Sequence, residues 1–152
     1  MPDLEVLENP KTNLASEIFT SDGKTLAKYY FNDNRTPVTF DELPTHLVDA
    51  LIATEDIRFY SHSGIDFKRT FGAALKFGKD GGGSTITQQL AKLLFTGEGS
   101  KDIIERLTQK FKEYIIAVRL ERNYTKDEII TQYLNLYDFG NNGDGIRSAA
   151  RI

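Results

Sequence analysis

Two adjacent carboxylates, Glu55 and Asp56, follow directly on an apolar run and are the residues of this chain best suited to acid–base chemistry. The run before them, residues 47–53, has the composition of a buried helix. Two acids at the C-terminal end of such a helix repel each other and face the negative end of the helix dipole, so each holds a proton more readily. Both are therefore candidate proton acceptors near neutral pH. The alternative is an ordinary pair of surface acids at a helix end.

The segment after the two acids has the composition of a tight turn. It contains the aromatic Phe59, one of only two histidines (His62), Gly64 and a third carboxylate, Asp66. We expect Phe59, His62 and Gly64 to brace the turn that aims Glu55. No serine or cysteine nucleophile stands in a recognisable motif with His62, so a hydrolase triad is not predicted.

A glycine-rich segment that includes Gly82 runs into a predicted helix with Ser84 as its N-cap. Glycines permit close approach of a ligand, and the N–H groups at the helix start suit an anion. Helical spacing predicts a polar stripe and an opposite, core-facing apolar stripe. The polar stripe is Thr85, Gln88, Gln89 and Lys92, and the apolar stripe is Ile86, Leu90, Leu93 and Leu94. The segment lacks the ending of a nucleotide P-loop, so no nucleotide is predicted.

Together these segments resemble the peptidoglycan glycosyltransferase domain of glycosyltransferase family 51, found in class A penicillin-binding proteins and monofunctional transglycosylases. Residues 55–66 match every fixed position of the first family motif, E-D-x-x-F-x-x-H-x-G-x-D, and residues 82–92 match the second, G-x-S-T-I-T-Q-Q-x-x-K. The third motif, R-K-x-x-E, is present as Gln109, Lys110 and Glu113, with glutamine in place of arginine. Lys101 and Arg106 are the candidates to replace that charge. Residues 126–146 are similar to the fourth motif.

The resemblance implies a mainly α, lysozyme-like helical domain that polymerises glycan chains from lipid II, a disaccharide-pentapeptide on undecaprenyl pyrophosphate. It implies that Glu55 is the general base and that Glu113 is the second catalytic acid, which stabilises the leaving group. Inverting chemistry predicts that a cleft separates the two glutamates. Mg²⁺ or another divalent cation is a candidate cofactor, and no organic cofactor is implied. The implied substrate-binding residues are Asp56, Gly82, Ser84, Gln88, Gln89, Lys92 and Lys110.

Two alternatives remain open at this point. The first is a lysozyme-like, peptidoglycan-cleaving enzyme with Glu55 as general acid. The glycine-rich segment and Lys92 argue against it, because a glycosidic leaving group carries no pyrophosphate. The second is a chain that binds the lipid or partner proteins but turns over poorly, because it lacks the C-terminal part of the domain and a membrane anchor.

The composition narrows the class of protein. A chain of 152 residues with 39% hydrophobic residues can form one domain with a core. A net charge of −3 argues against non-specific nucleic-acid binding. The absence of cysteine excludes disulfides, thiolate catalysis and cysteine-bound zinc. No signal peptide and no apolar run long enough to span a bilayer is visible, although the family normally carries an N-terminal membrane helix. We therefore expect an excised portion of a longer protein.

The resemblance also implies partners and a location. The partners are lipid II, the growing glycan chain, the membrane surface and other cell-wall synthesis proteins. The location is the outer or periplasmic face of the bacterial cytoplasmic membrane.

Local patterns predict the elements that position these residues. Residues 1–37 are predicted to be a polar N-terminal segment and a β-hairpin, with strands at 16–20 and 25–31 around an Asp-Gly turn. Residues 38–152 are predicted to be the glycosyltransferase domain, truncated at its C-terminus. Helices are predicted after Pro44, from the cap Asp66 to Gly78, from Ser100, and from a capping box of Thr125 and Glu128. The predicted core stripe of the helix from Ser100 is Ile103, Ile104, Leu107, Phe111, Tyr114, Ile115 and Val118.

Residues 67–77 combine apolar and basic side chains more densely than a solvated helix requires. The apolar members are Phe67, Phe71, Leu75 and Phe77, and the basic members are Lys68, Arg69 and Lys76. This combination suits contact with acyl chains and anionic headgroups, with Phe77 the best candidate for exposure. The alternative is that all four apolar side chains face the core.

Overall fold

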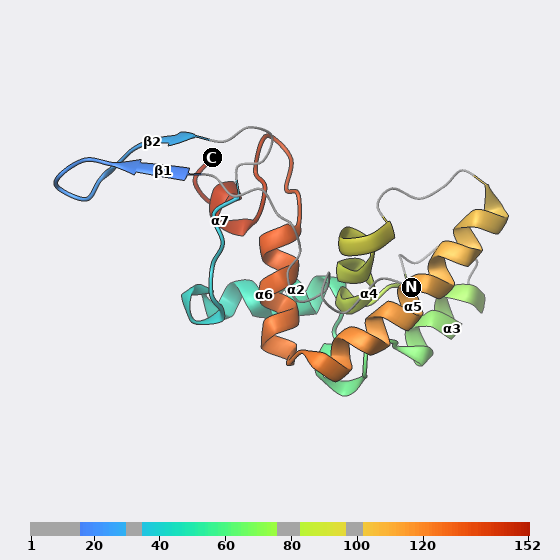
Figure 1. Cartoon of the computed structure of the whole chain (residues 1–152). Helices are drawn as coiled ribbons and strands as arrows, with labels where there is room; N and C mark the ends of the chain where they lie inside the picture. The colour runs from blue at the N-terminus through green and yellow to red at the C-terminus, as the bar shows by residue number, and fades with distance from the viewer. Residues whose placement is uncertain (1–15, 30–34, 76–82, 97–101) are drawn as a thin grey trace. The chain divides into compact units, whose positions relative to one another are not determined.

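The computed structural model describes residues 16–29, 35–75, 83–96 and 102–152, and these are mainly α-helical, as predicted (Figure 1). The elements in chain order are β1 Ser16–Phe19, β2 Thr25–Tyr29, η1 Phe40–Glu42, α2 Thr45–Glu55, η2 Phe59–Ser61, α3 Phe67–Leu75, α4 Ile86–Ala91, η3 Lys92–Thr96, α5 Ile103–Asn123, α6 Lys126–Leu136 and α7 Ile146–Ala149. The elements η1 and η2 are 3₁₀ turns, and η3 is a π-helical turn. Within the described ranges, no helix is long and apolar enough to cross a bilayer.

The chain divides into two compact units. The first unit joins Met1–Thr39 with Leu134–Ile152, and the second is Phe40–Tyr133. The predicted boundary between residues 37 and 38 therefore falls inside the first unit. The described residues of the first three motifs all belong to the second unit.

The first unit contains the predicted hairpin. Strands β1 and β2 pair antiparallel, and the turn between them has Gly23 at a φ of +80°, which glycine adopts without strain. The predicted ends at Tyr30 and Phe31 lie outside the described residues. Further along this unit, the amide side chain of Asn135 makes two hydrogen bonds of 2.9 Å with the backbone of Val38. It donates to the Val38 carbonyl and accepts from the Val38 N–H.

The second unit has its core where α4 packs against α5. Helix α4 is short, and nearly all of its side chains are buried. The fully buried side chains of this unit include Phe59, Ile86, Leu90, Leu120, Ile129 and Ile130. A helix that is buried nearly all round has no solvated stripe, so its polar side chains must find partners inside the protein.

Helix α5 buries a different face from the predicted one. It begins at Ile103, where the side chain of Asp102 accepts from the N–H of Ile104, whereas the predicted start at Ser100 lies outside the described residues. Five members of the predicted core stripe are exposed, namely Ile103, Ile104, Leu107, Phe111 and Ile115. The buried residues of the helix are Glu113, Ile116, Ala117 and Leu120. The prediction is wrong because the small Ala117 lets the backbone at Gly64 approach α5 closely.

Helices α3 and α6 begin with the predicted side-chain caps. At α3, Asp66 accepts from the N–H of Arg69 at 3.0 Å. At α6, the N–H of Thr125 donates to the Glu128 carboxylate at 2.7 Å, and the Thr125 hydroxyl accepts from the N–H of Glu128. The bond from the Thr125 backbone lowers the pKa of Glu128. Both caps are local, so the sequence alone could predict them.

The aromatic side chains at the start of α3 face solvent. Phe67 is 74% exposed and Phe71 is 72% exposed, so the alternative that all apolar residues of this segment face the core is wrong for these two. The side chain of Leu75 and the whole of Phe77, predicted to be the most exposed, lie outside the described part.

Candidate active site

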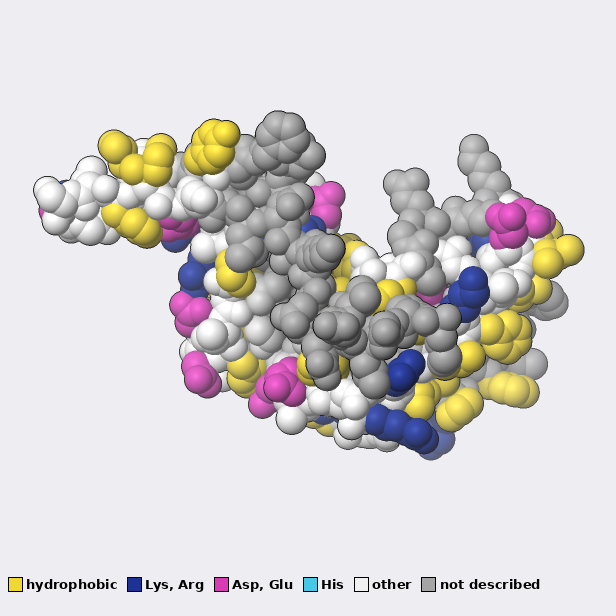
Figure 2. All heavy atoms as spheres, in the orientation of Figure 1, with side chains coloured by type: hydrophobic (Ala, Val, Ile, Leu, Met, Phe, Trp, Pro, Cys, Tyr) yellow, Lys and Arg dark blue, Asp and Glu magenta, His cyan; other side chains and the backbone are white. Residues whose placement is uncertain are grey.

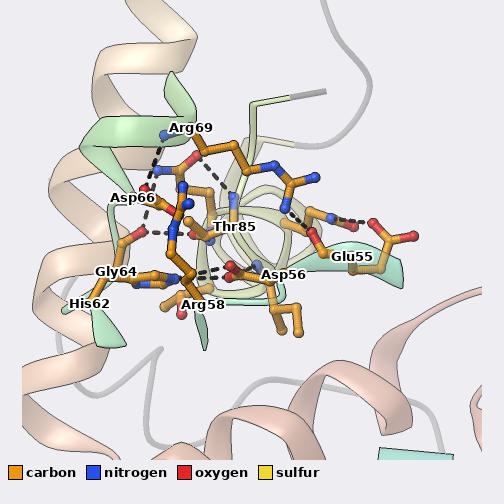
Figure 3. A network of polar contacts seen from close by, with 12 residues as sticks. Glu55, Asp56, Arg58, His62, Gly64, Asp66, Arg69 and Thr85 are labelled. Atoms are coloured by element: carbon orange, nitrogen blue, oxygen red, sulfur yellow. Dashed lines mark hydrogen bonds and ion pairs between the residues drawn. The ribbon is translucent and has the colours of Figure 1, made fainter. Parts of the chain in front are cut away.

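The turn after α2 separates the two adjacent carboxylates. Glu55 is the last residue of α2, and the backbone leaves the helix at Asp56, whose side chain is fully buried. His62 approaches this carboxylate with Nε2 3.0 Å from Oδ2, and the N–H of Ile86 donates to the same oxygen at 3.1 Å (Figure 3). The buried acid is thus satisfied by donors from its own turn and from the start of α4.

This arrangement corrects the prediction for the start of α4. The first N–H of the helix is occupied by Asp56 of the protein itself, rather than left open for an anion. The N-cap is Thr85, not Ser84: the Thr85 hydroxyl accepts from the N–H of Gln88, while the Gln88 side chain accepts from the N–H of Thr85. The Ser84 hydroxyl instead accepts from the Lys110 ammonium at 2.8 Å.

Gly64 fixes the first-motif turn against α4 and α5. Its φ is +90°, and a Cβ at this position would lie 2.8 Å from the backbone carbonyl atoms of Ala117. Its own carbonyl accepts from the Thr85 hydroxyl at 2.7 Å and from the Gln88 amide at 3.3 Å. Only glycine fits both the backbone conformation and the space, as the expected bracing role requires.

The predicted polar stripe of α4 is largely internal. Thr85 and Gln88 are buried in the capping box, whereas Gln89 is half-buried. Lys92 is exposed, and it begins the π-helical turn η3, a kind of element that is frequent at functional sites. The predicted apolar stripe is also incomplete, since Leu93 is exposed. Gly82 lies outside the described residues.

Glu55 keeps a side chain that is only half-buried. Its Oε2 accepts from the amide of Gln89 at 2.8 Å, and the amide oxygen of Gln89 accepts from the hydroxyl of Tyr133 at 3.0 Å. The tyrosine therefore sets which way the Gln89 amide points, so that its NH₂ group faces the carboxylate. Sequence reasoning missed Tyr133, although it lies within the segment similar to the fourth motif.

Two arginines brace the first-motif turn. The sequence predicts neither as a site residue, and Arg69 only as a basic member of residues 67–77. Arg69 donates from its guanidinium to the carbonyl of Glu55, and Arg58 donates from Nε to Asp66 at 2.8 Å (Figure 3). The bond from Arg58 holds the pKa of Asp66 below its ordinary value and raises the pKa of Arg58 itself. The only feature of the sequence that could have indicated these roles is that both residues are cations close to the three acids of the first motif.

Lys126 supports the same turn from the start of α6. Its Nζ donates to the carbonyl of His62 at 2.7 Å and lies 4.2 Å from the centroid of the Phe59 ring. It also donates to Glu121, which accepts from the buried hydroxyl of Thr87. This network was not predicted, because its members are far apart in the sequence.

The third motif contacts the second motif through a hydrogen bond from Lys110 to Ser84. Lys110 Nζ lies 2.8 Å from Glu113 Oε2 in an i, i+3 ion pair, and it donates equally closely to the Ser84 hydroxyl. Glu113 is buried, whereas Lys110 is about one-third exposed. A buried carboxylate beside a more accessible ammonium keeps that cation in a defined place.

The described residues do not offer a group of three acidic, histidine or cysteine side chains that could hold a metal ion. The carboxylate of Glu113 is already neutralised by Lys110. The described residues therefore do not form a complete metal-ion site.

Comparison with known proteins gives the same family as the sequence motifs. The family model described as Transglycosylase matches residues 22–152. The chain is 38% identical to penicillin-binding protein 1A of Escherichia coli (strain K12), in an alignment that covers 100% of the chain and 18% of that protein.

Two proteins of Bacillus subtilis (strain 168) are also similar. Penicillin-binding protein 1F is 43% identical, over 90% of the chain and 19% of that protein. Penicillin-binding protein 1A/1B is 42% identical, over 92% of the chain and 15% of that protein. The chain thus spans less than a fifth of the length of these curated relatives.

Proposed function

Because the chain belongs to the transglycosylase family, we propose that it polymerises peptidoglycan glycan chains from lipid II, with inversion at the anomeric carbon and release of undecaprenyl pyrophosphate. The observation that carries this proposal is the placement of Glu55. Its half-buried carboxylate is oriented by Gln89, and its carbonyl is held by Arg69. A carboxylate that is held in place yet remains accessible suits a general base.

In the proposed reaction, Glu55 takes the proton from the 4-hydroxyl of the acceptor sugar. The hydroxyl oxygen forms a bond to the anomeric carbon of the growing chain, and the bond from that carbon to the pyrophosphate oxygen breaks. The attack comes from the face opposite the leaving group, which gives the β-1,4 link without a covalent glycosyl-enzyme. The proton remains on Glu55 until solvent removes it.

The leaving pyrophosphate carries away negative charge, which cations of this chain can stabilise. Lys110 is the best-placed candidate, because it is bound by both Ser84 and the buried Glu113. Glu113 would then act by holding Lys110, and exposed Lys92 would supply a second charge. Asp56 and Gln88 are buried, so we propose that they orient the site rather than touch the substrate.

We further propose that the domain works at a membrane surface, on the outer or periplasmic face of the bacterial cytoplasmic membrane. Lipid II keeps its lipid in the bilayer, so the enzyme must reach the sugar at that surface. The exposed Phe67 and Phe71 on α3 and the exposed apolar side chains of α5 support this contact, because a soluble protein rarely exposes so many large apolar residues together. Other cell-wall synthesis proteins are proposed partners.

Replacing Glu55 tests the proposed base. Glu55→Gln should lower lipid II polymerisation by about 10²–10⁴-fold, because it removes the proton acceptor while preserving the shape of the side chain. Thermal unfolding should be nearly unchanged. The matched control is Asp49→Asn, which removes an exposed acid from the same helix and should leave the rate unchanged. A Glu55→Gln variant with most of the wild-type rate would rule out the assignment.

A further inference from the structure

A pocket of about 450 Å³ lies between the first-motif turn, the start of α3 and the middle of α5. Its lining includes Arg58, His62, Ile65, Phe67, Lys68 and Val118. Glu55, Gln89, Lys110 and Glu113 are not among the described residues that line it. The pocket is therefore distinct from the residues assigned to the reaction.

The charge around this pocket favours an anion. Lys68 is exposed and has no ion-pair partner among the described residues. Arg58 uses its Nε for Asp66, so its two terminal NH₂ groups remain as donors, and its side chain is 43% exposed. The one acidic residue of the lining, Asp66, is already paired with Arg58. The lining consequently carries one uncompensated positive charge.

His62 adds a buried polar atom that lacks a partner. Its side chain is only 8% exposed, and its Nε2 points to Asp56, which can only accept, so Nε2 carries the proton. Its Nδ1 is buried and has no hydrogen-bond partner within the described part of the chain. In the neutral ring this nitrogen is an acceptor, and buried acceptors are normally satisfied. His62 lines the pocket, so a hydroxyl group bound there would satisfy this nitrogen once the ring turns Nδ1 toward it.

Apolar side chains border the cations on the same side of the second unit. Ile65, Phe67 and Val118 line the pocket, and Phe71 follows Phe67 one turn along α3. On α5, Phe111 and Ile115 continue the stripe that reaches Val118, and both are exposed. Figure 2 shows hydrophobic side chains gathered where Figure 1 places α3 and α5, with Lys and Arg side chains beside them.

We propose that this pocket binds the headgroup of an anionic phospholipid that bears hydroxyl groups, such as phosphatidylglycerol. Its phosphate would contact Lys68 and Arg58, a headgroup hydroxyl would donate to His62 Nδ1, and its acyl chains would lie over Phe67, Phe71 and the exposed stripe of α5. This inference rests on the proposed membrane contact and gives it a specific lipid class. A choline headgroup fits poorly, because its cation would face Lys68 and it offers no hydroxyl.

Vesicle binding tests the charge requirement with the full 152-residue chain. Wild type should bind vesicles of phosphatidylcholine with 30% phosphatidylglycerol more tightly than vesicles of phosphatidylcholine alone. Lys68→Gln should weaken binding to the anionic vesicles about five-fold. The control Lys112→Gln, an exposed lysine of α5 outside the pocket, should have a smaller effect. Equal losses for the two variants, or no loss for Lys68→Gln, would overturn the pocket.

Soluble short-chain lipids test the pocket itself. Dihexanoyl-phosphatidylglycerol should shift the amide NMR signals of residues 61–68 and 118, and Lys68→Gln should abolish these shifts. Dihexanoyl-phosphatidylcholine and inorganic phosphate should produce much smaller shifts. Equal shifts with inorganic phosphate would mean a bare anion site and would overturn the lipid assignment.

Polymerisation in detergent solution separates this inference from the proposed function. Lys68→Gln should polymerise lipid II there at the wild-type rate. A wild-type chain that binds anionic vesicles but does not polymerise would reject the proposed function and leave the pocket standing. A wild-type chain that polymerises but binds neither vesicle would reject the membrane contact and the pocket together.

Discussion

Glu55, Asp56 and Glu113 are three carboxylates in different surroundings, and each environment suits a different role. Asp56 is fully buried between His62 and the start of α4, so we propose that it holds the turn rather than touching a substrate. Glu55, its neighbour, is half-buried with an oriented amide beside it. Glu113 is buried against Lys110. Asp56, a buried structural acid, and Glu55, the candidate base, are thus neighbours in the chain but differ in their surroundings.

The ion pair between Arg58 and Asp66 should make stability depend on pH. The pKa of Asp66 in the folded protein lies below its ordinary value of 3.8, chiefly because Arg58 donates a hydrogen bond to the ionised form. This stabilisation is present above the ordinary value and is lost as the pH falls through the lowered one. Arg58→Gln should therefore lower the free energy of unfolding at pH 7, and the deficit should shrink as the pH falls below 3.8.

Urea unfolding at pH 7 and at about pH 2.5 measures this deficit. The control is Arg122→Gln, the loss of an exposed arginine in the last turn of α5, whose small effect should not follow the titration of Asp66. A deficit for Arg58→Gln that is the same at both pH values would contradict the assignment.

Gly64 should tolerate no side chain. Gly64→Ala should destabilise the protein by about 1–3 kcal/mol, because the new Cβ would meet the Ala117 backbone and the backbone would be strained at a φ of +90°. Gly72→Ala is the matched control: Gly72 lies in α3, and a Cβ added there would meet no neighbouring segment within 4 Å. That change should be neutral or stabilising. Thermal unfolding compares the two, and similar Tm values would contradict the close approach at Gly64.

At the scale of elements, α5 has an apolar exposed side and a partly polar buried side. Its exposed side carries large residues such as Phe111, whereas its buried side includes Ala117 and the charged Glu113. This inversion is possible because Glu113 is satisfied by Lys110 and because Ala117 permits close contact with Gly64. We propose that the exposed side contacts the bilayer.

The same substitution at two isoleucines of α5 tests which side is buried. Ile104→Ser should change the free energy of unfolding by no more than about 0.5 kcal/mol, because this side chain is 73% exposed. Ile116→Ser should cost about 2–5 kcal/mol, because it removes a buried side chain from the contact with the core. Urea unfolding gives both values. If Ile104→Ser were the more costly change, the predicted stripe would face the core after all.

At the scale of the whole chain, the first unit joins residues from near both ends of the sequence. Asn135, at the C-terminal end of α6, makes two 2.9 Å hydrogen bonds with the backbone of Val38, and Arg151 pairs with Glu17 at 2.7 Å. The amide pair at Asn135 is the better buried of the two links, since Val38 is buried and Arg151 is exposed.

Removing the Asn135 amide should break its two hydrogen bonds with the Val38 backbone. Asn135→Ala leaves the N–H and carbonyl of Val38 without their partner, which should cost about 1–3 kcal/mol. Hydrogen exchange at the Val38 amide should accelerate by at least ten-fold. The control is Asn123→Ala, where the lost bond joins an exposed amide to the carbonyl of Arg119 in its own helix. Unchanged protection of Val38 in Asn135→Ala would show that the link does not hold the unit together.

The sequence alone determined the features of this protein that depend on neighbours in the chain. The hairpin turn, the cap at Asp66, the capping box at Thr125 and the Lys110–Glu113 pair were all predictable, because each joins residues no more than a few positions apart. The mainly α fold class follows from the same local patterns. The family also followed from the sequence, because the motif residues stand at fixed spacings.

Only the tertiary structure decided which side chains are buried. Asp56 binds the start of α4 thirty positions later in the chain, and Tyr133 orients Gln89 across forty-four positions. Periodicity predicts that the exposed stripe of α5 faces the core, because it locates an apolar face but does not say what covers that face. That choice depends on the small Ala117 opposite Gly64 and on partners for buried polar groups, which are contacts between distant segments.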